Sequence, residues 1–119
     1  MKILIAEDEP MILKTLHLYL SRAGFSVLTA TNGQNAIEIF DQQRPDMVVT
    51  DLLMPYADGM ELISHIRNTK ESNVPIVVVS TVGLESSVIS ALKLGADDYI
   101  VKPLRLNEVV ARVNRFLRA

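Results

Sequence analysis

Residues 48–59 read VVTDLLMPYADG, in which a short apolar run leads directly into a single carboxylate, Asp51, followed by more apolar residues and a proline. The apolar, β-branched residues before Asp51 predict a strand that is buried on both faces, as strands of parallel sheets are. A carboxylate at the end of such a strand loses free energy unless a cation or a hydrogen-bond donor pairs with it. The rest of the chain is therefore expected to supply a positive partner for Asp51.

Outward from this stretch, short apolar runs alternate with longer segments whose apolar residues recur with the period of a helix. A repeated strand–helix alternation predicts an α/β fold, with a parallel sheet covered by helices on both faces. The strands are expected at residues 3–6, 25–30, 46–50, 75–80 and 99–101, and the helices at 10–23, around 36–40, 59–68, 85–95 and 106–117.

Length and composition narrow the class of protein. The chain has 119 residues, 49% of them hydrophobic and 22% charged, which suits one globular domain over residues 1–119. It contains no cysteine, so disulfides and thiolate metal sites are excluded. There is no long apolar run and no signal-peptide pattern, so we expect a cytoplasmic location without membrane contact. The net charge of −2 gives no general attraction for nucleic acid, and we expect no direct binding to it.

Charged and hydroxyl side chains follow several of the predicted strands, at the edge where parallel α/β sheets place functional groups. Glu7 and Asp8 follow the first strand, Asp51 the third, Ser80 ends the fourth and Lys102 follows the fifth. Three ionised carboxylates can share a small space only if a cation compensates them, and an all-oxygen set of ligands favours Mg²⁺. A carboxylate beside Mg²⁺ and a lysine can act as a nucleophile and carry an aspartyl-phosphate.

Each of these groups, taken alone, has a simpler interpretation. Asp8 or Glu9 can cap the helix that begins at Pro10, and Asp51 can be a turn residue. Lys102 can belong to an ordinary loop. The conjunction favours a functional site, because groups of suitable chemistry follow different strands and nothing comparable lies at the opposite strand ends.

With these residues in place, the sequence resembles a response-regulator receiver domain of two-component signalling, of the chemotaxis-regulator type. The resemblance covers the whole chain. It is carried by four stretches in the family's order and spacing: ILIAEDEP, DMVVTDLLMPYADGMELISHIR, PIVVVST and LKLGADDYIVKPL. It implies a flavodoxin-like, doubly wound sheet of five parallel strands in the order 2-1-3-4-5, with five helices.

The resemblance also implies the chemistry of the acidic residues. Asp51 would accept a phosphoryl group from a sensor histidine kinase or a phosphotransfer protein. Glu7, Asp8 and Asp51 would hold Mg²⁺, with Mn²⁺ as an alternative ion, and the backbone carbonyl of Leu53 would add a further ligand. The domain would then be a phosphoacceptor switch rather than an enzyme.

A second group of residues would respond to phosphorylation. The resemblance implies that Lys102 pairs with the phosphoryl oxygens and that the Lys102–Pro103 peptide is cis. The Ser80 hydroxyl would turn toward the phosphoryl group, and Tyr99 would rotate inward behind it. Taken alone, Tyr99 is more simply a half-buried strand residue with a solvated hydroxyl.

Three positions depart from the family's usual pattern. Thr81 stands where alanine or glycine is common, and its bulk should narrow access to Asp51. Leu53 and Val82 occupy the positions that often orient or exclude the hydrolytic water, and neither side chain can form a hydrogen bond. We expect slow self-dephosphorylation, because the attacking water is neither oriented nor admitted.

The resemblance places the output face on the fourth predicted helix, the fifth strand and the fifth helix, where a second copy of the chain or a downstream effector would bind. The charges that the family uses in a shared dimer face are present at Asp98, Glu108 and Arg112, but Val88 stands where a basic residue is expected. With Leu84 one turn earlier, Val88 would extend an apolar strip, unless both are ordinary surface residues. The residues assigned to this face are Val88, Asp98, Tyr99, Glu108 and Arg112.

Other functions are less well supported. A haloacid-dehalogenase-like phosphatase needs a second aspartate two residues after the nucleophile, and that position is Leu53. A flavin carrier needs a Ser/Thr/Gly-rich phosphate loop after the first strand, which the sequence lacks. A constitutive interaction module would have a damaged acidic site, whereas this one is intact. His17 and His65 are expected to be ordinary surface residues.

Overall fold

The computed structural model describes residues 1–54, 56–69, 73–81 and 83–117. Its sheet has five parallel strands in the order β2-β1-β3-β4-β5, which confirms the predicted order and fold class. The strands are β1 (Lys2–Ala6), β2 (Ser26–Ala30), β3 (Met47–Thr50), β4 (Ile76–Ser80) and β5 (Asp98–Val101). The helices of the described ranges are α1 (Pro10–Arg22), α2 (Gly33–Gln43), α3 (Gly59–Arg67), α4 (Glu85–Leu94) and α5 (Leu106–Leu117).

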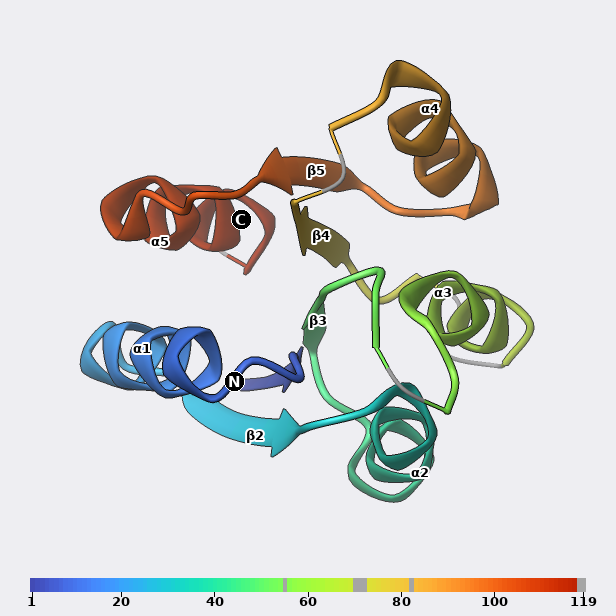
Figure 1. Cartoon of the computed structure of the whole chain (residues 1–119). Helices are drawn as coiled ribbons and strands as arrows, with labels where there is room; N and C mark the ends of the chain where they lie inside the picture. Colours follow the sequence, from blue (N-terminus) through green and yellow to red (C-terminus); the bar gives the residue numbers. More distant parts are fainter. Residues whose placement is uncertain (55, 70–72, 82, 118–119) are drawn as a thin grey trace.

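Helices cover both faces of the sheet, as Figure 1 shows: α1 and α5 lie on one face, and α2, α3 and α4 on the other. Each face holds its own apolar cluster. The central strands β1, β3 and β4 contribute side chains to both clusters because successive residues of a strand point to opposite faces. This two-sided burial explains why these strands are almost continuously apolar in the sequence.

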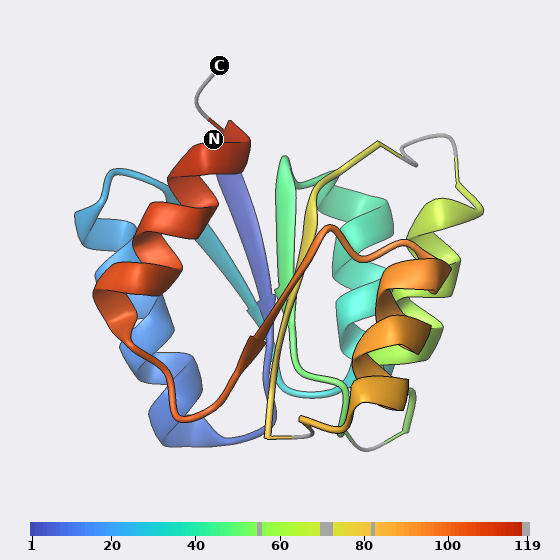
Figure 2. The same ribbon diagram turned by 90° about the horizontal axis from the view of Figure 1, so that it is seen from above.

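The carboxyl ends of the strands meet at one edge of the sheet, and the N-terminus and the last turn of α5 lie at the opposite edge (Figure 2). Strand register sets which side chains meet there. Ala6 pairs with Thr50, so the next residues, Glu7 and Asp51, leave their strands side by side. The Asp51 N–H donates to the Ala6 carbonyl at 2.9 Å, which extends the pairing by one step.

Contacts at the start of α3 hold the end of the loop that joins β3 to α3. The Asp58 carboxylate caps α3 by accepting a hydrogen bond from the Glu61 N–H at 2.9 Å. Gly59 follows the cap and packs so closely that an added Cβ would lie 2.1 Å from the Asp51 carbonyl oxygen. Only glycine allows this approach, and the start of α3 therefore determines where the Asp51 backbone lies.

Arg67, at the end of α3, connects three segments at the edge opposite the acidic residues. Its guanidinium donates to the Gly95 carbonyl at 2.9 and 2.7 Å, to the Val74 carbonyl at 2.7 Å and to the Asp97 carboxylate at 2.9 Å. The same Asp97 oxygen accepts the Ile76 N–H at 2.8 Å. Arg67 thus joins α3 to the beginnings of β4 and β5.

In the described part of the chain, no helix is long and apolar enough to cross a membrane.

Candidate functional site

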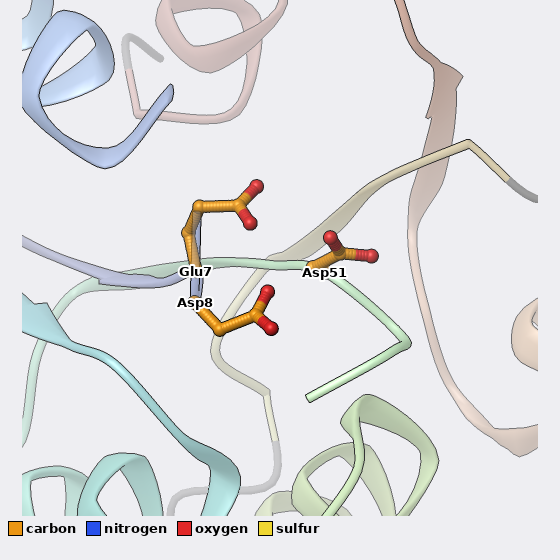
Figure 3. A group of neighbouring side chains, drawn as sticks. All are labelled: Glu7, Asp8 and Asp51. Carbon is orange, nitrogen blue, oxygen red and sulfur yellow. The ribbon is translucent and has the colours of Figure 1, made fainter. Parts of the chain in front are cut away.

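Three carboxylates meet at the carboxyl edge of the sheet (Figure 3). Glu7 and Asp8 follow β1 and Asp51 follows β3, and one oxygen of each lies within 4.8 Å of the others. Glu7 is fully buried and Asp51 is 6% exposed, whereas Asp8 is open to solvent. The residues that sequence analysis selected for a metal site are therefore brought together, with one of them accessible from outside.

Lys102 is the positive partner that the buried carboxylates require. It follows β5, and its Nζ lies 2.6 Å from Glu7 Oε1 and 2.8 Å from Asp51 Oδ2. Its side chain is only 5% exposed, and its backbone N–H donates to the Ser80 carbonyl at 2.8 Å. The peptide bond between Lys102 and Pro103 is cis. The sequence predicted Lys102 at this edge as a positive partner for Asp51, but not its contact with Glu7.

Burial and charge shift two pKa values in this group. Burial raises the pKa of Glu7, with a further contribution from the Asp51 charge, although hydrogen bonds from Lys102 and the Glu9 N–H oppose the shift. Burial alone would lower the pKa of Lys102, but hydrogen bonding and attraction from Asp51 and Glu7 outweigh it and raise that pKa. Lys102 is therefore a cation at neutral pH.

The charges of the site suit a divalent cation. When all three carboxylates are ionised, the single ammonium leaves two negative charges uncompensated in a largely buried cluster. The available donors are carboxylate and carbonyl oxygens, which suit Mg²⁺ rather than a soft metal. The residues present therefore fit a magnesium ion.

Local backbone contacts hold the Asp51 carboxylate from its other side. Asp51 Oδ1 accepts hydrogen bonds from the Leu52 N–H at 2.6 Å and from the Leu53 N–H at 3.3 Å. Asp51 Oδ1 thus makes the local hydrogen bonds of a turn residue, while Oδ2 pairs with Lys102. Capping does not explain Glu9: it is the N-cap residue of α1, but its side chain makes no capping hydrogen bond.

Comparison with known proteins shows the family. Residues 3–114 match the model of the response regulator receiver domain. The chain belongs to this family. Receiver domains are signalling modules that carry a phosphoacceptor and bind Mg²⁺ at acidic residues. The acidic cluster at the strand ends is therefore the expected place for both properties.

Several relatives of this receiver domain are named as transcriptional regulators. The chain is 44% identical over 117 residues to the probable transcriptional regulator ycf27 of Galdieria sulphuraria, covering 98% of this chain and 45% of that protein. It is 38% identical to the alkaline phosphatase synthesis transcriptional regulatory protein PhoP of Bacillus subtilis, covering 98% of this chain and 48% of that protein. The chain thus spans about half the length of the curated relatives it matches.

Solved receiver domains have the same fold. The BeF3-activated N-terminal receiver domain of Klebsiella pneumoniae RstA is 30% identical, with a TM-score of 0.92 and full coverage (100%) of both chains. A chain of the CheX–CheY–BeF3–Mg complex from Borrelia burgdorferi is 30% identical with a TM-score of 0.92, covering 99% of this chain and 90% of that one.

The residues proposed to respond to phosphorylation or to set its lifetime lie on or after strands β3, β4 and β5. Ser80 is fully buried at the end of β4, and Thr81 after it is exposed. Tyr99 on β5 is half-buried and packs against the apolar cluster beneath α2, α3 and α4. The Leu53 side chain is 60% exposed beside Asp51, and Val82 lies outside the described residues.

The predicted output face carries charges that pair within the chain. Arg112 on α5 donates to Asp98 Oδ1 at 3.0 Å and to Glu108 Oε1 at 2.9 Å, while Arg115 lies 3.6 Å from Asp98. Val88 is half-buried rather than fully exposed. Large apolar side chains are nevertheless exposed on α4, at its N-cap residue and on β5: Leu84, Ile89, Leu92, Leu94 and Val101.

Two features of the receiver domain escaped sequence analysis. His65 on α3, expected to be an ordinary surface residue, lies 2.8 Å from Asp41 on α2 and contacts the Phe40 ring edge-on, with centroids 6.4 Å apart. His17 is exposed, as expected. A hollow of about 250 Å³ also lies beside the site, lined by Met11, Ile12, Thr15, Lys102, Pro103, Leu104 and Leu106. No spacing rule in the sequence relates residues so far apart.

Proposed function

We propose that this receiver domain is a phosphoacceptor switch in which Asp51 takes a phosphoryl group from the phosphohistidine of a sensor histidine kinase or a phosphotransfer protein. One observation carries the proposal: a nearly buried aspartate that pairs with a lysine ammonium and lies beside two further carboxylates at the carboxyl edge of the sheet. A purely structural ion pair needs only one carboxylate for one lysine. The additional negative charges have a physical reason only if a further cation binds.

Glu7, Asp8 and Asp51 would hold the Mg²⁺ ion, together with the Leu53 backbone carbonyl. Mn²⁺ suits the same oxygen donors. When bound, the ion supplies positive charge for the phosphoryl oxygens that approach Asp51. Asp8, the exposed member, is the carboxylate that an ion from solvent meets first. Buried Glu7 is held by Lys102 and by the Glu9 N–H, which suits a supporting role.

The transfer step follows from the contacts of Asp51. A carboxylate oxygen of Asp51 forms a bond to phosphorus as the N–P bond of the phosphohistidine breaks, and the electron pair returns to the imidazole nitrogen, which takes a proton from solvent. The Leu52 and Leu53 N–H groups keep the carboxylate oriented. Lys102, already 2.8 Å from Asp51 Oδ2, can turn to the new phosphoryl oxygens without leaving the site.

The new charge then acts on β4 and β5. The Ser80 hydroxyl donates to a phosphoryl oxygen, which draws the end of β4 inward, and Tyr99 moves further into the space beneath α4. These shifts remodel α4, β5 and α5, including the ion pairs of Asp98, Glu108 and Arg112. Val88 and its exposed apolar neighbours on α4 would then contact a second copy of the chain or a downstream effector.

Residues around Asp51 would set the duration of the signal. Leu53 offers no hydrogen bond to a hydrolytic water, and Thr81 adds bulk at the entrance. Val82, outside the described residues, belongs to the same prediction from sequence. We infer slow self-dephosphorylation, with no catalytic turnover beyond self-phosphorylation from small donors and this slow hydrolysis.

The context of the domain is also a proposal. Residues 1–119 form one receiver domain, working in the cytoplasm without direct binding to nucleic acid or to a membrane. The named relatives are transcriptional regulators about twice as long, so transcriptional control through a separate output domain is the function that they suggest.

A mass measurement tests the proposal. The protein is incubated with acetyl phosphate and Mg²⁺, and its intact mass is recorded beside Asp51→Asn and an EDTA control. We expect one added phosphoryl group in the wild type and none in the variant or the control. Continuous release of phosphate from many esters would instead indicate a phosphatase, and an unchanged wild-type mass would contradict the proposal.

A further inference from the structure

A second site lies on the same edge of the sheet, between the start of α2 and the loop that joins β3 to α3. We propose that it receives an arginine side chain of a protein that docks at Asp51, a proposal that rests on the phosphoacceptor function. The site is a hollow of about 200 Å³, lined by Asn32, Gln34, Asn35, Glu38 and Tyr56.

Tyr56 is the unusual residue of this hollow. Its backbone φ is +71°, in the left-handed region that bulky L-residues rarely occupy, and Arg44 is the only other such non-glycine residue in the described ranges. The Tyr56 side chain is 85% exposed, so packing within the domain does little to offset that conformational cost. A strained aromatic residue held in solvent is better explained by contact with another molecule than by stability.

The chemistry of the lining selects the ligand. The hollow is lined by a carboxylate residue, Glu38, three residues with side-chain amides and the aromatic residue Tyr56, and no lysine or arginine is among its lining residues. A guanidinium group suits this set, because its planar fork donates several hydrogen bonds and stacks on aromatic rings.

An anion is the alternative that a helix N-terminus would suggest, since α2 begins at this hollow. Asn32 already caps the helix, with its Oδ1 accepting the Asn35 N–H at 2.8 Å. The Glu38 carboxylate, about one turn further along α2, would repel an anion. The lining therefore favours a cation over a phosphate or carboxylate.

The location of the hollow suits a protein partner. Tyr56 lies in the loop that leads from Asp51 to α3, and Asn32 lies in the loop after β2, so both belong to the edge that holds the acidic cluster. A protein that brings a phosphohistidine to Asp51 must cover this edge. A small donor such as acetyl phosphate reaches Asp51 without touching Tyr56.

An NMR titration tests the proposal, with N-acetyl-L-arginine amide as the probe and the uncharged isostere N-acetyl-L-citrulline amide as its matched control. We expect saturable shifts of the Asn32, Asn35 and Tyr56 amides with the arginine probe and binding weaker by about fivefold with citrulline. Tyr56→Gly and Glu38→Gln should lose the arginine response but gain the phosphoryl group from acetyl phosphate at the wild-type rate.

Tyr56→Gly should also unfold at a higher temperature than the wild type, because glycine relieves the positive φ. Loss of binding together with a gain in stability is a combination that a structural role for Tyr56 cannot produce. The proposal is overturned if arginine gives no saturable local shifts, if citrulline binds equally well, or if Tyr56→Gly keeps the arginine response. The acetyl phosphate reaction tests the phosphoacceptor function separately.

Discussion

Replacing Lys102 with methionine keeps most of the apolar stem but removes the ammonium that lies 2.6 Å from Glu7 Oε1 and 2.8 Å from Asp51 Oδ2. Removing one partner of a buried ion pair typically costs about 3–5 kcal/mol. Glu7 can limit this loss by taking up a proton. For a group with the ordinary pKa of 4.5, that protonation costs about 3 kcal/mol at pH 7. For Glu7 the cost is lower, because burial already raises its pKa. We therefore expect the free energy of unfolding to fall by about 2–3 kcal/mol at pH 7 without divalent cations.

The effect should depend on pH in a defined direction. Because burial raises the pKa of Glu7 above its unfolded value of 4.5, its contribution to stability is fully present below pH 4.5 and is lost as the pH rises through the folded value. The loss of unfolding free energy caused by Lys102→Met should therefore be smaller near pH 4.5 than at pH 7. Lys102 itself has a raised pKa, so its contribution persists up to its ordinary value of 10.5 and is lost at still higher pH.

Urea unfolding followed by far-ultraviolet circular dichroism measures these differences, since the sequence has no tryptophan for fluorescence. Lys14→Met, on the exposed surface of α1, is the matched control and should change stability by less than about 0.5 kcal/mol. Mg²⁺ should reduce the loss of unfolding free energy caused by Lys102→Met. The double variant Lys102→Met/Glu7→Gln should be more stable than Lys102→Met alone. A loss of less than about 0.5 kcal/mol at pH 7, or a loss that is equal at both pH values, would contradict an electrostatic role for Lys102.

Three further substitutions probe separate parts of the structure. Arg67→Ala should lower the free energy of unfolding by about 2 kcal/mol in the same urea assay, because it leaves two partly buried carbonyls without their donor, whereas exposed Arg105→Ala should have almost no effect. Gly59→Ala should slow phosphorylation from acetyl phosphate by about tenfold, since its Cβ would displace the Asp51 backbone; a wild-type rate would contradict this role. Thr81→Ala should shorten the lifetime of the phosphorylated protein by a few fold as water gains access, and unchanged decay of a radiolabelled sample would exclude control by Thr81.

The sequence predicted the fold well because local signals and the global fold agree. Periodicity and β-branched runs located the strands to within one residue: β3 begins at Met47 rather than Asp46, and β5 begins at Asp98 rather than Tyr99. Those ends differ because side-chain polarity, which marks a boundary in sequence, does not determine where ladder hydrogen bonds begin. The predicted start of α5 at Leu106 matches the structure.

The site was predicted in composition, and Lys102 was expected as a positive partner for Asp51, but the contact between Lys102 and Glu7 was not predicted. The carboxyl ends of parallel strands lie at one edge of a sheet, and this rule was enough to predict that Glu7, Asp8 and Asp51 lie together. The bridge made by Lys102 depends on a side-chain conformation and on a contact across 95 positions of sequence, which no periodic pattern records. The same reason applies to the contacts of Arg67 and to the His65–Asp41 pair, because both form between elements whose relative placement only the folded chain determines.

Chemical trapping of the phosphorylated residue identifies the phosphoacceptor. The protein is phosphorylated with acetyl phosphate and Mg²⁺ and then reduced with borohydride, which converts an aspartyl-phosphate to homoserine. Peptide mass spectrometry then locates the homoserine. We expect homoserine at position 51 alone, and none when EDTA replaces Mg²⁺. Homoserine at Asp8 or Asp58 instead, or its absence from a protein that has gained the phosphoryl mass, would contradict the assignment of Asp51 as phosphoacceptor.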